Sequence, residues 1–313
     1  MLKLDNISKV YRVGTFGGKA LHAVSEVSFD VPDGEVVSLI GESGSGKSTI
    51  GRMILRLISL SSGAIVFNGV DVSTLRGNAL KEYYRGVQGV FQDPFSSYNP
   101  IFKADRVFAT IKEEFFPDMQ GSEWAGRVSS ALEAVGLNPD EVLNKFPHQL
   151  SGGQLQRFLI ARALLLDIQF LVADEIISML DASTRIDVLN LLADLKARRL
   201  SILFITHDLS LGYYISEKSV ILYRGCVAEM GLTEKIYAKP LHPYTRMLMA
   251  AVPRLDKKWE EVKIELKAQQ AELSGGCAYY DRCTSASKDT SCSRSKPELV
   301  EVAPGHFVAC SKL

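Results

Sequence analysis

Short apolar runs alternate with helical patterns over much of the chain. The runs at 36–40, 170–173 and 202–205 lack polar alternation, as is typical of strands that are buried on both faces of a sheet. After the first run, apolar residues recur with the spacing of a helix that packs on a sheet: Ile50, Met53, Ile54 and Leu57. Repetition of this strand–loop–helix unit predicts an α/β fold with a mostly parallel sheet, which binds ligands at the carboxyl ends of its strands.

Two segments depart from this pattern. Residues 1–34 show short alternating runs and turn residues, which predict a small antiparallel sheet at the edge of the molecule. From about residue 93 to 165 the spacing between two strands becomes helical, which predicts an inserted helical subdomain. We therefore expect a parallel α/β core that carries an antiparallel edge and a helical insert.

Composition and charge narrow the possible roles. Lys plus Arg and Asp plus Glu each number 36, so the net charge is zero and no field of one sign would attract nucleic acid or an anionic membrane. The N-terminus lacks a signal-peptide pattern, and no stretch reaches the ~18 to 20 uncharged apolar residues of a spanning helix. We expect a cytoplasmic chain that binds no nucleic acid and reaches a membrane only through a protein partner.

A phosphate-binding motif follows the first buried run. Residues 41–48 read Gly-Glu-Ser-Gly-Ser-Gly-Lys-Ser, in which two glycines separated by four residues precede Lys and Ser. Such glycines let backbone N–H groups surround phosphate oxygens, Lys47 can reach the terminal phosphates, and Ser48 can ligate Mg²⁺. A Gly-rich turn with a chance Lys is the alternative, but the position between a predicted strand and helix favours a nucleotide. The residues expected at ATP are Gly41, Ser43, Gly44, Ser45, Gly46, Lys47, Ser48 and Thr49.

Polar residues follow three other predicted strands at the same edge of the sheet. The second buried run ends in Asp174, suited to hold Mg²⁺, and Glu175, suited to orient and deprotonate the attacking water. His207 follows the third run and can donate to a γ-phosphate, while Gln92 follows another apolar run and can contact water or the metal. Alone, these residues also fit a solvated strand end, a surface His and an ordinary loop Gln. Beside a phosphate loop they predict a nucleotide hydrolase.

One further motif resembles that of a single family. Residues 150–154 read Leu-Ser-Gly-Gly-Gln, similar to the signature sequence of ABC ATPases, and lie 16 residues before the strand that carries Asp174. The phosphate loop, signature, acidic strand, D-loop and switch histidine follow in the family's order. The resemblance covers residues 1 to about 235 and implies an ABC ATPase domain there, with a C-terminal extension at 236–313. It also implies that Tyr11 stacks on adenine.

The resemblance implies a second ATPase chain as well. In ABC proteins the signature of one subunit caps the γ-phosphate bound by its partner, so ATP joins the two subunits and its hydrolysis releases them. The implied residues are Ser151, Gly152, Gly153 and Gln154 in the signature and Ser178 and Asp181 in the D-loop. Between the acidic strand and Asp181 the family usually reads Pro-Thr-Ser-Ala-Leu, whereas this chain reads Ile-Ile-Ser-Met-Leu from 176 to 180. We expect this departure to shift the D-loop and slow hydrolysis.

The C-terminal sequence resembles the ATPases of oligopeptide and dipeptide importers. The resemblance rests on His-Pro-Tyr-Thr at 242–245, Gln-Asp-Pro-Phe-Ser-Ser-Tyr-Asn-Pro at 92–100 and the cysteine pattern from 276 to 310. It implies a heterodimer of ATPases, two transmembrane permease subunits, an external substrate-binding protein and a peripheral position on the inner face of the cell membrane. Members of this group also import nickel or oligosaccharides. We expect the segment 92–100 to dock a permease helix through Phe95 and Tyr98.

Four of the five cysteines lie in the C-terminal extension: Cys277, Cys283, Cys292 and Cys310. Their gaps fit neither the short Cys pairs of zinc ribbons nor the compact runs of ferredoxins, so the spacing indicates only four thiols that could share a site. Zinc, two disulfides and free thiols stay open as alternatives. The resemblance to the importer group implies an iron–sulfur cluster of the 4Fe-4S type that orders this extension.

Two other classes of function share the phosphate loop. A soluble ABC protein of DNA repair or translation would show two ATPase cassettes, a long coiled coil or a basic face, and the sequence shows none of these. A small-molecule kinase gives no reason for the motif at 150–154. We therefore expect a subunit that binds ATP and Mg²⁺, hydrolyses ATP and powers an importer.

Overall fold

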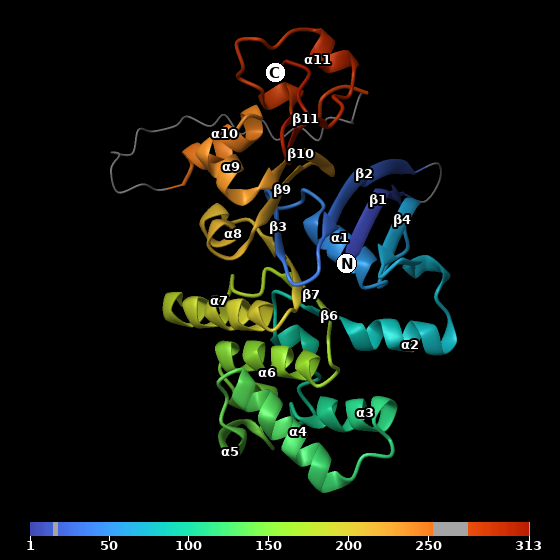
Figure 1. Cartoon of the computed structure of the whole chain (residues 1–313), viewed down its shortest axis with the longest axis vertical. Helices are drawn as coiled ribbons and strands as arrows, with labels where there is room; N and C mark the ends of the chain where they lie inside the picture. The colour runs from blue at the N-terminus through green and yellow to red at the C-terminus, as the bar shows by residue number, and fades with distance from the viewer. Residues whose placement is uncertain (15–17, 253–274, 313) are drawn as a thin grey trace.

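The larger of two sheets forms the centre of the protein. The structure, a computed structural model, describes residues 1–14, 18–252 and 275–312 of the chain. This sheet has eight strands in the order β11-β12-β10-β9-β3-β8-β7-β6 (Figure 1). Neighbouring strands from β9 to β6 are parallel and those from β11 to β9 are antiparallel. Its strands are β3 (Val36–Ile40), β6 (Val87–Val90), β7 (Phe170–Asp174), β8 (Ser201–Thr206), β9 (Lys218–Tyr223), β10 (Cys226–Leu232), β11 (Val300–Ala303) and β12 (His306–Val308).

The three uninterrupted apolar runs form the central strands β3, β7 and β8, which confirms the predicted parallel core. Their side chains alternate between two apolar clusters, one on each face of the sheet. In β7, Leu171 and Ala173 pack with the helical insert, whereas Phe170 and Val172 pack with apolar residues of α1 (Lys47–Ile54) and the smaller sheet. Burial on both faces explains why these strands contain no polar alternation.

The smaller sheet is antiparallel, with the order β2-β1-β4-β5, and confirms the predicted antiparallel edge. Its strands are β1 (Leu2–Val13), β2 (Lys19–Val31), β4 (Ser62–Phe67) and β5 (Val70–Asp71). Helix α1 contacts β2 of this sheet and β7 and β8 of the larger one, so it lies between the two sheets (Figure 1). The turn that precedes α1 is thereby placed where both sheets meet.

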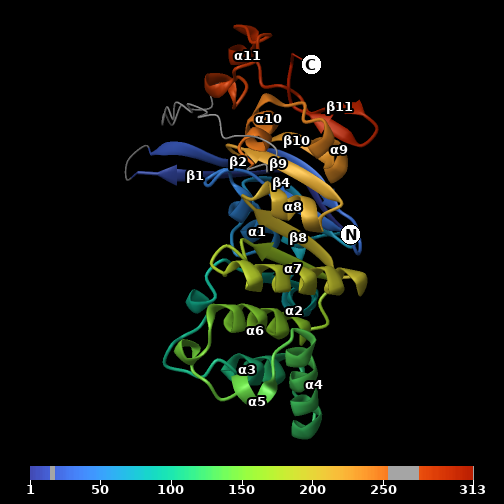
Figure 2. The same cartoon turned by 90° about the vertical axis from the view of Figure 1, so that its left-hand side faces the viewer.

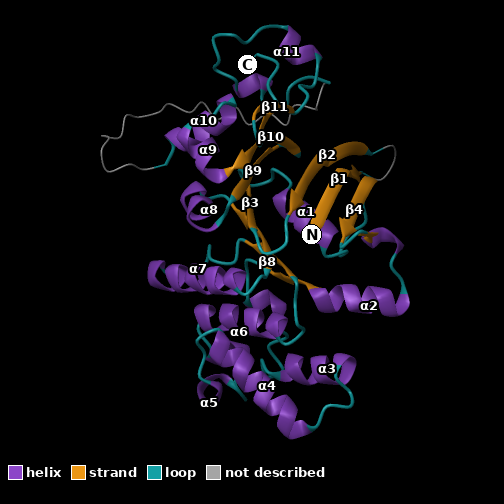
Figure 3. Ribbon diagram, in the orientation of Figure 1, coloured by secondary structure: helices purple, strands orange, loops and turns teal. Residues whose placement is uncertain are grey.

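The helical insert lies between β6 and β7 in sequence and forms one end of the molecule, as Figure 3 shows. Its core contains Phe108, Trp124, Leu132 and Phe158. The helices and turns from β5 to β7 are η1 (Val72–Thr74), α2 (Gly77–Gly86), η2 (Phe95–Ser97), α3 (Arg106–Phe115), α4 (Gly121–Ala134), α5 (Pro139–Val142), η3 (Pro147–Gln149) and α6 (Gly152–Leu164). All but η1 and α2 belong to the insert, so the predicted change to helical spacing is confirmed.

The remaining helices follow the later strands. They are α7 (Ala182–Ala197), α8 (Leu209–Ile215), α9 (Thr233–Ala238), α10 (Pro243–Ala250), η4 (Tyr280–Arg282) and α11 (Ser291–Arg294). The C-terminal segments lie at the end of the molecule opposite the helical insert (Figures 1 and 2). Within the described ranges, no helix combines the length and apolar character needed to cross a membrane.

The C-terminal hairpin of β11 and β12 adds to the edge of the larger sheet through β10. The side chain of Glu229, which is fully buried in β10, joins this hairpin to α10. Its carboxylate accepts hydrogen bonds from the backbone N–H groups of Leu241 and His242, at 3.0 and 2.9 Å, and lies 2.7 Å from Nε2 of His306 in β12. Part of the extension predicted at 236–313 thus shares the main sheet, and residues 253–274 of it lie outside the described residues.

The predicted iron–sulfur cluster is wrong. Among the residues that the structure describes, which include all four of these cysteines, no group of three or more His, Cys, Asp or Glu residues could hold a metal ion. Cys277 and Cys283 instead pack against the apolar cluster around Tyr244 and Tyr279, where a thiol serves as a small apolar side chain. The thiol of Cys292 contacts Asp289 and Ser311, each at 3.8 Å. All four cysteines are free thiols.

Candidate nucleotide site

The turn between β3 and α1 requires glycine at two places. Gly46 has a φ of +103°, and a Cβ there would lie 2.4 Å from the backbone oxygen of Ala23. At Gly41 a Cβ would lie 2.2 Å from the backbone oxygen of Leu222 in β9. Because β2 and β9 approach the turn so closely, the backbone can curl only where side chains are missing. Gly44, with a φ of +78°, adds a second left-handed residue.

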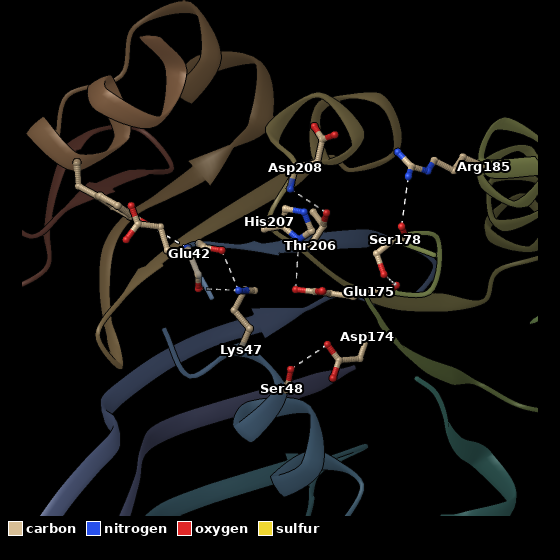
Figure 4. Close-up of polar contacts among 12 residues, drawn as sticks. Glu42, Lys47, Ser48, Asp174, Glu175, Ser178, Arg185, Thr206, His207 and Asp208 are labelled. Carbon is tan, nitrogen blue, oxygen red and sulfur yellow. Dashed lines mark hydrogen bonds and ion pairs between the residues drawn. The ribbon is translucent and has the colours of Figure 1, made fainter. Parts of the chain in front are cut away.

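The side chain of Lys47 is hydrogen-bonded to the backbone of this turn. Its buried Nζ donates to the backbone oxygens of Gly41 and Glu42, at 2.8 and 2.9 Å (Figure 4). Desolvation lowers the pKa of Lys47, while the nearby charges of Glu175, Asp174 and Glu42 oppose this shift. The ammonium group is therefore held at the turn by carbonyl oxygens and faces a negative environment. Such a group suits an anionic ligand.

Asp174 and Ser48 lie side by side next to Lys47. The Ser48 hydroxyl donates to Oδ1 of Asp174 at 3.1 Å (Figure 4). Burial raises the pKa of Asp174, and the bond from Ser48 acts in the opposite direction. A hydroxyl and a carboxylate oxygen are the type of ligands that Mg²⁺ takes in nucleotide sites, so this pair fits the metal that the sequence predicts. The bound ion would supply positive charge beside the phosphates.

Glu175 and His207 face each other above this pair. Nδ1 of His207 lies 3.4 Å from Oε1 of Glu175 (Figure 4). The imidazole is exposed, whereas Glu175 is only 17% exposed. Glu175 directly follows β7, and His207 directly follows β8, the neighbouring parallel strand. The backbone N–H of Glu175 donates to the backbone oxygen of Ile205 in β8 at 3.0 Å. The structure therefore brings together the Lys, Ser, Asp, Glu and His residues predicted from three separate segments.

The D-loop, which contains Ser178 and Asp181, is hydrogen-bonded to Glu175. The backbone oxygen of Glu175 accepts from the N–H and the hydroxyl of Ser178, at 3.1 and 2.9 Å. Arg185 of α7 donates to the backbone oxygens of Leu180 and Ser178, at 2.7 and 3.2 Å. Asp181 caps α7 by accepting from the N–H of Thr184 at 3.0 Å. Hydrogen bonds from the Ser183 hydroxyl, and then from the N–H and hydroxyl of Thr184, hold the pKa of Asp181 well below its usual range.

The signature residues lie on the helical insert. Ser151 and Gln154 form a capping box at the start of α6, with bonds of 2.9 and 3.1 Å between the side chain of each and the backbone N–H of the other. Gly153 packs against α7, because a Cβ there would lie 2.7 Å from Cγ2 of Thr184. These contacts fix the signature at the start of α6 and against α7.

Two other predicted residues are exposed on separate elements. Gln92 lies in the loop after β6. Tyr11 lies on β1; the residue is 36% exposed, and Nζ of Lys9 lies 5.2 Å from the centroid of its ring. Both side chains are free to meet a ligand, and neither forms part of the Lys47–Asp174–Glu175 cluster drawn in Figure 4.

Sequence reasoning missed a contact of the turn with the C-terminal extension. Both carboxylate oxygens of Glu42 accept from the guanidinium of Arg282, and its backbone N–H donates to the hydroxyl of Tyr244. These partners are 240 and 202 residues away in the chain. The sequence around them resembles the importer group, but nothing in that local pattern indicates where Tyr244 and Arg282 dock.

Comparisons with known proteins agree with this geometry. The family model described as ABC transporter matches residues 24–178, and that of the oligopeptide/dipeptide transporter C-terminal region matches residues 228–292. This chain belongs to the ABC transporter family and is an ATP-binding, ATP-hydrolysing member of it.

Individual relatives match nearly the whole chain. A putative peptide import ATP-binding protein of Brucella ovis is 41% identical over 99% of this chain and 97% of its own length. The oligopeptide transport ATP-binding protein OppF of Bacillus subtilis is 40% identical over 93% of this chain and 90% of its own length. A similar solved structure is the dimeric ATP-binding cassette MJ0796 in a post-hydrolysis state with ADP and Pi. It is 29% identical, has a TM-score of 0.67, and the match covers 74% of this chain and 99% of that cassette.

Proposed function

We propose that this chain is the ATP-hydrolysing subunit that powers an importer of oligopeptides or dipeptides. The observation that carries the proposal is the match of residues 228–292 to the C-terminal region of such transporters. Relatives named as peptide import ATP-binding proteins, similar over nearly the whole chain, support it. Nickel or oligosaccharides are the alternative cargo, since the ATPase itself contacts no cargo.

Each residue of the cluster has a distinct role in this proposal. The N–H groups of residues 41–49 and the ammonium of Lys47 bind the phosphates, and Tyr11 stacks on adenine. Ser48 and Asp174, joined by Gln92, would hold Mg²⁺. Glu175 takes a proton from the attacking water while the water oxygen bonds to the γ-phosphorus. The bond from that phosphorus to the bridging oxygen breaks, and ADP leaves with the bridging oxygen.

His207 orients Glu175 and contacts the γ-phosphate in this proposal. Its contact with Glu175 holds the carboxylate, and the imidazole is exposed enough to donate to the γ-phosphate. The signature of a second ATPase chain, equivalent to residues 151–154, completes the site. A dimer is therefore needed for turnover, and a solved cassette of this fold is itself described as dimeric. We propose a heterodimer, with Ser178 and Asp181 near the junction.

The permease subunits dock on the segment 92–100 in this proposal. Phe95 is 48% exposed, and the neighbouring Ile101 and Phe102 are exposed as well, so the segment presents apolar surface. Tyr98 differs from Phe95 because it is half-buried and its ring packs against Phe158 of α6, with centroids 6.3 Å apart. Tyr98 would thus anchor the segment to the insert, and Phe95 would face the permease.

Reconstitution tests the proposal. The chain is assembled with its partner ATPase and two permease subunits in vesicles, and ATP hydrolysis and uptake of labelled peptide are measured against Lys47→Ala as the inactive control. We expect the permeases to stimulate hydrolysis and peptide to accumulate only with the unmodified chain. Uptake of nickel or an oligosaccharide instead of peptide would change the cargo. Stimulation by DNA, ribosomes or a phosphate acceptor alone would overturn the transport role.

A further inference from the structure

Glu42, the second residue of the phosphate-binding turn, is held by the C-terminal extension at two points. Arg282 forms a fork with its side chain, with Nη1 2.7 Å from Oε2 and Nη2 3.0 Å from Oε1. The hydroxyl of Tyr244 accepts from the backbone N–H of Glu42 at 3.0 Å. A paired guanidinium and carboxylate fix both distance and orientation, which a single ion contact does not.

The two contacting side chains are themselves fixed by packing. Tyr244 is fully buried, and its ring centroid lies 4.6 Å from that of Tyr223 and 5.4 Å from that of Tyr279. The guanidinium of Arg282 lies over the rings of Tyr223 and Tyr279, at 5.8 and 5.9 Å. Tyr223 ends β9, the strand against which Gly41 packs. The extension therefore reaches the turn through a rigid aromatic cluster.

Glu42 also links this contact to Lys47. The backbone oxygen of Glu42 accepts from Nζ of Lys47 at 2.9 Å. Glu42 is thus bonded through all three of its polar groups. Its N–H bonds to Tyr244, its carboxylate to Arg282, and its backbone oxygen to Lys47. A shift of Glu42 would move the carbonyl that positions Lys47.

We propose that Arg282 is a positioning residue of the ATP site, which holds Glu42 so that the phosphate-binding turn and Lys47 are set for the nucleotide. Tyr244 acts with it on the backbone. The C-terminal extension thereby helps to determine the affinity of the ATPase for ATP. This inference rests on the proposed binding of ATP at residues 41–49 and adds a residue that lies after the whole ATPase region.

Steady-state kinetics of the full chain in its reconstituted complex test the proposal. Arg282→Ala should raise the KM for ATP about two- to fivefold, the effect of losing a partly exposed ionic fork, and change kcat by less than about twofold. Arg282→Lys, which offers one point contact instead of a fork, should fall between. Combining Arg282→Ala with Glu42→Ala should add little to either change alone, because both remove the same contact.

Matched controls separate positioning from general docking of the extension. Lys296 pairs with Glu26 of β2 and so ties the same extension to the smaller sheet without touching the turn. Lys296→Ala should leave the KM for ATP unchanged. An equal KM in Arg282→Ala and the unmodified protein, or an equal rise in Lys296→Ala, would overturn the proposal. If Arg282→Ala does not fold, Tyr244→Phe and Arg282→Lys decide in its place, and an unchanged KM in both would overturn it as well.

Lys47→Ala distinguishes failure of this inference from failure of the proposed function. Loss of ATP binding in Lys47→Ala beside an unchanged KM in Arg282→Ala would refute only the positioning role. Normal ATP binding in Lys47→Ala would refute the ATP site itself.

Discussion

Glu175 has an unusual backbone for a residue at the end of a strand. Its φ is +51°, in the left-handed region that residues with a Cβ adopt rarely and that is frequent at functional sites. This turn separates the direction of its side chain from that of the preceding Asp174. The first carboxylate meets Ser48 and the second meets His207. Two adjacent acids can thus serve different steps.

Glu175→Gln should keep ATP binding but lose about 10²- to 10⁴-fold in turnover, because an amide cannot take a proton from water. The variant should also accumulate as an ATP-bound dimer, since in the proposed mechanism hydrolysis releases the partner chain. Steady-state hydrolysis, labelled-ATP binding and size-exclusion chromatography measure these outcomes. Glu234→Gln, an exposed acid at the start of α9, serves as control and should behave like the unmodified chain. Near-normal turnover of Glu175→Gln would remove this residue from the mechanism.

His242 predicts a pH dependence of stability. Burial lowers the pKa of His242 from 6.5 to about 4, against the opposing effect of the Glu229 charge. The unfolded chain therefore takes up this proton at higher pH than the folded chain does. Its contribution to the free energy of unfolding is retained above pH 6.5 and is lost as the pH falls from 6.5 to about 4.

His242→Asn isolates this effect, because Asn can still accept from the N–H of Tyr244 at the start of α10 but does not titrate. Urea denaturation from about pH 7.5 to about pH 4.5 should show a smaller loss of stability in this variant than in the unmodified chain. His148→Asn, at an exposed histidine, should keep the full pH dependence. Parallel curves for His242→Asn and the unmodified chain would contradict the assignment.

At the scale of elements, the turn from β7 to α7 contains the residues at 176–180 that differ from the usual ABC sequence. Ile176 and Ile177 are almost fully buried in the cluster that also contains the helical insert, whereas Met179 is 62% exposed. The two isoleucines thus contribute apolar contacts beneath the D-loop, while Ser178 keeps its bonds to Glu175. The effect of this turn on the rate of hydrolysis stays a prediction.

Ile177→Ala should lower the free energy of unfolding by about 2 to 5 kcal/mol, the usual cost of deleting a buried isoleucine side chain beyond Cβ. Urea denaturation with an unchanged m-value measures it. Ile186→Ala is the matched control, since Ile186 lies on the exposed side of α7 and its loss should change stability by about 0.5 kcal/mol or less. Equal losses in both variants would show that Ile177 does not pack as described.

Some elements could be predicted from sequence and others could not, for a physical reason. β3, β7 and β8 are buried on both faces, so their own residues carry the signal. The phosphate-binding turn is equally local, since glycine spacing and Lys47 determine it. The strand Val300–Ala303 is exposed throughout and forms only because β12 pairs with β10. The Arg282–Glu42 contact depends on that same long-range docking, and the spacing of the cysteines likewise did not reveal how their thiols pack.

At the scale of the whole molecule, one sheet connects the Lys47–Asp174–Glu175 cluster with both ends of the protein (Figure 1). Its apolar clusters contact the helical insert on one face and α1 with the smaller sheet on the other. The C-terminal hairpin extends the same sheet past β10. A change at the C-terminal end can therefore reach the nucleotide turn through the paired strands β9 and β10.

The C-terminal hairpin should be necessary for stability. Deleting residues 300–313 removes His306 from the buried carboxylate of Glu229 and exposes the backbone edge of β10. Leaving a buried carboxylate without one of its hydrogen-bond partners costs about 3 kcal/mol, so we expect a loss of this size in the free energy of unfolding, with aggregation through the open edge. Urea denaturation, limited proteolysis and light scattering measure these effects. Deleting only residues 311–313 is the control, because Lys312 pairs with Asp289 at the surface and such exposed ion pairs are worth about 0 to 1 kcal/mol. If the longer deletion unfolds at the same urea concentration as the shorter one, the hairpin is an appendage and the Glu229–His306 contact does not hold the extension to the sheet.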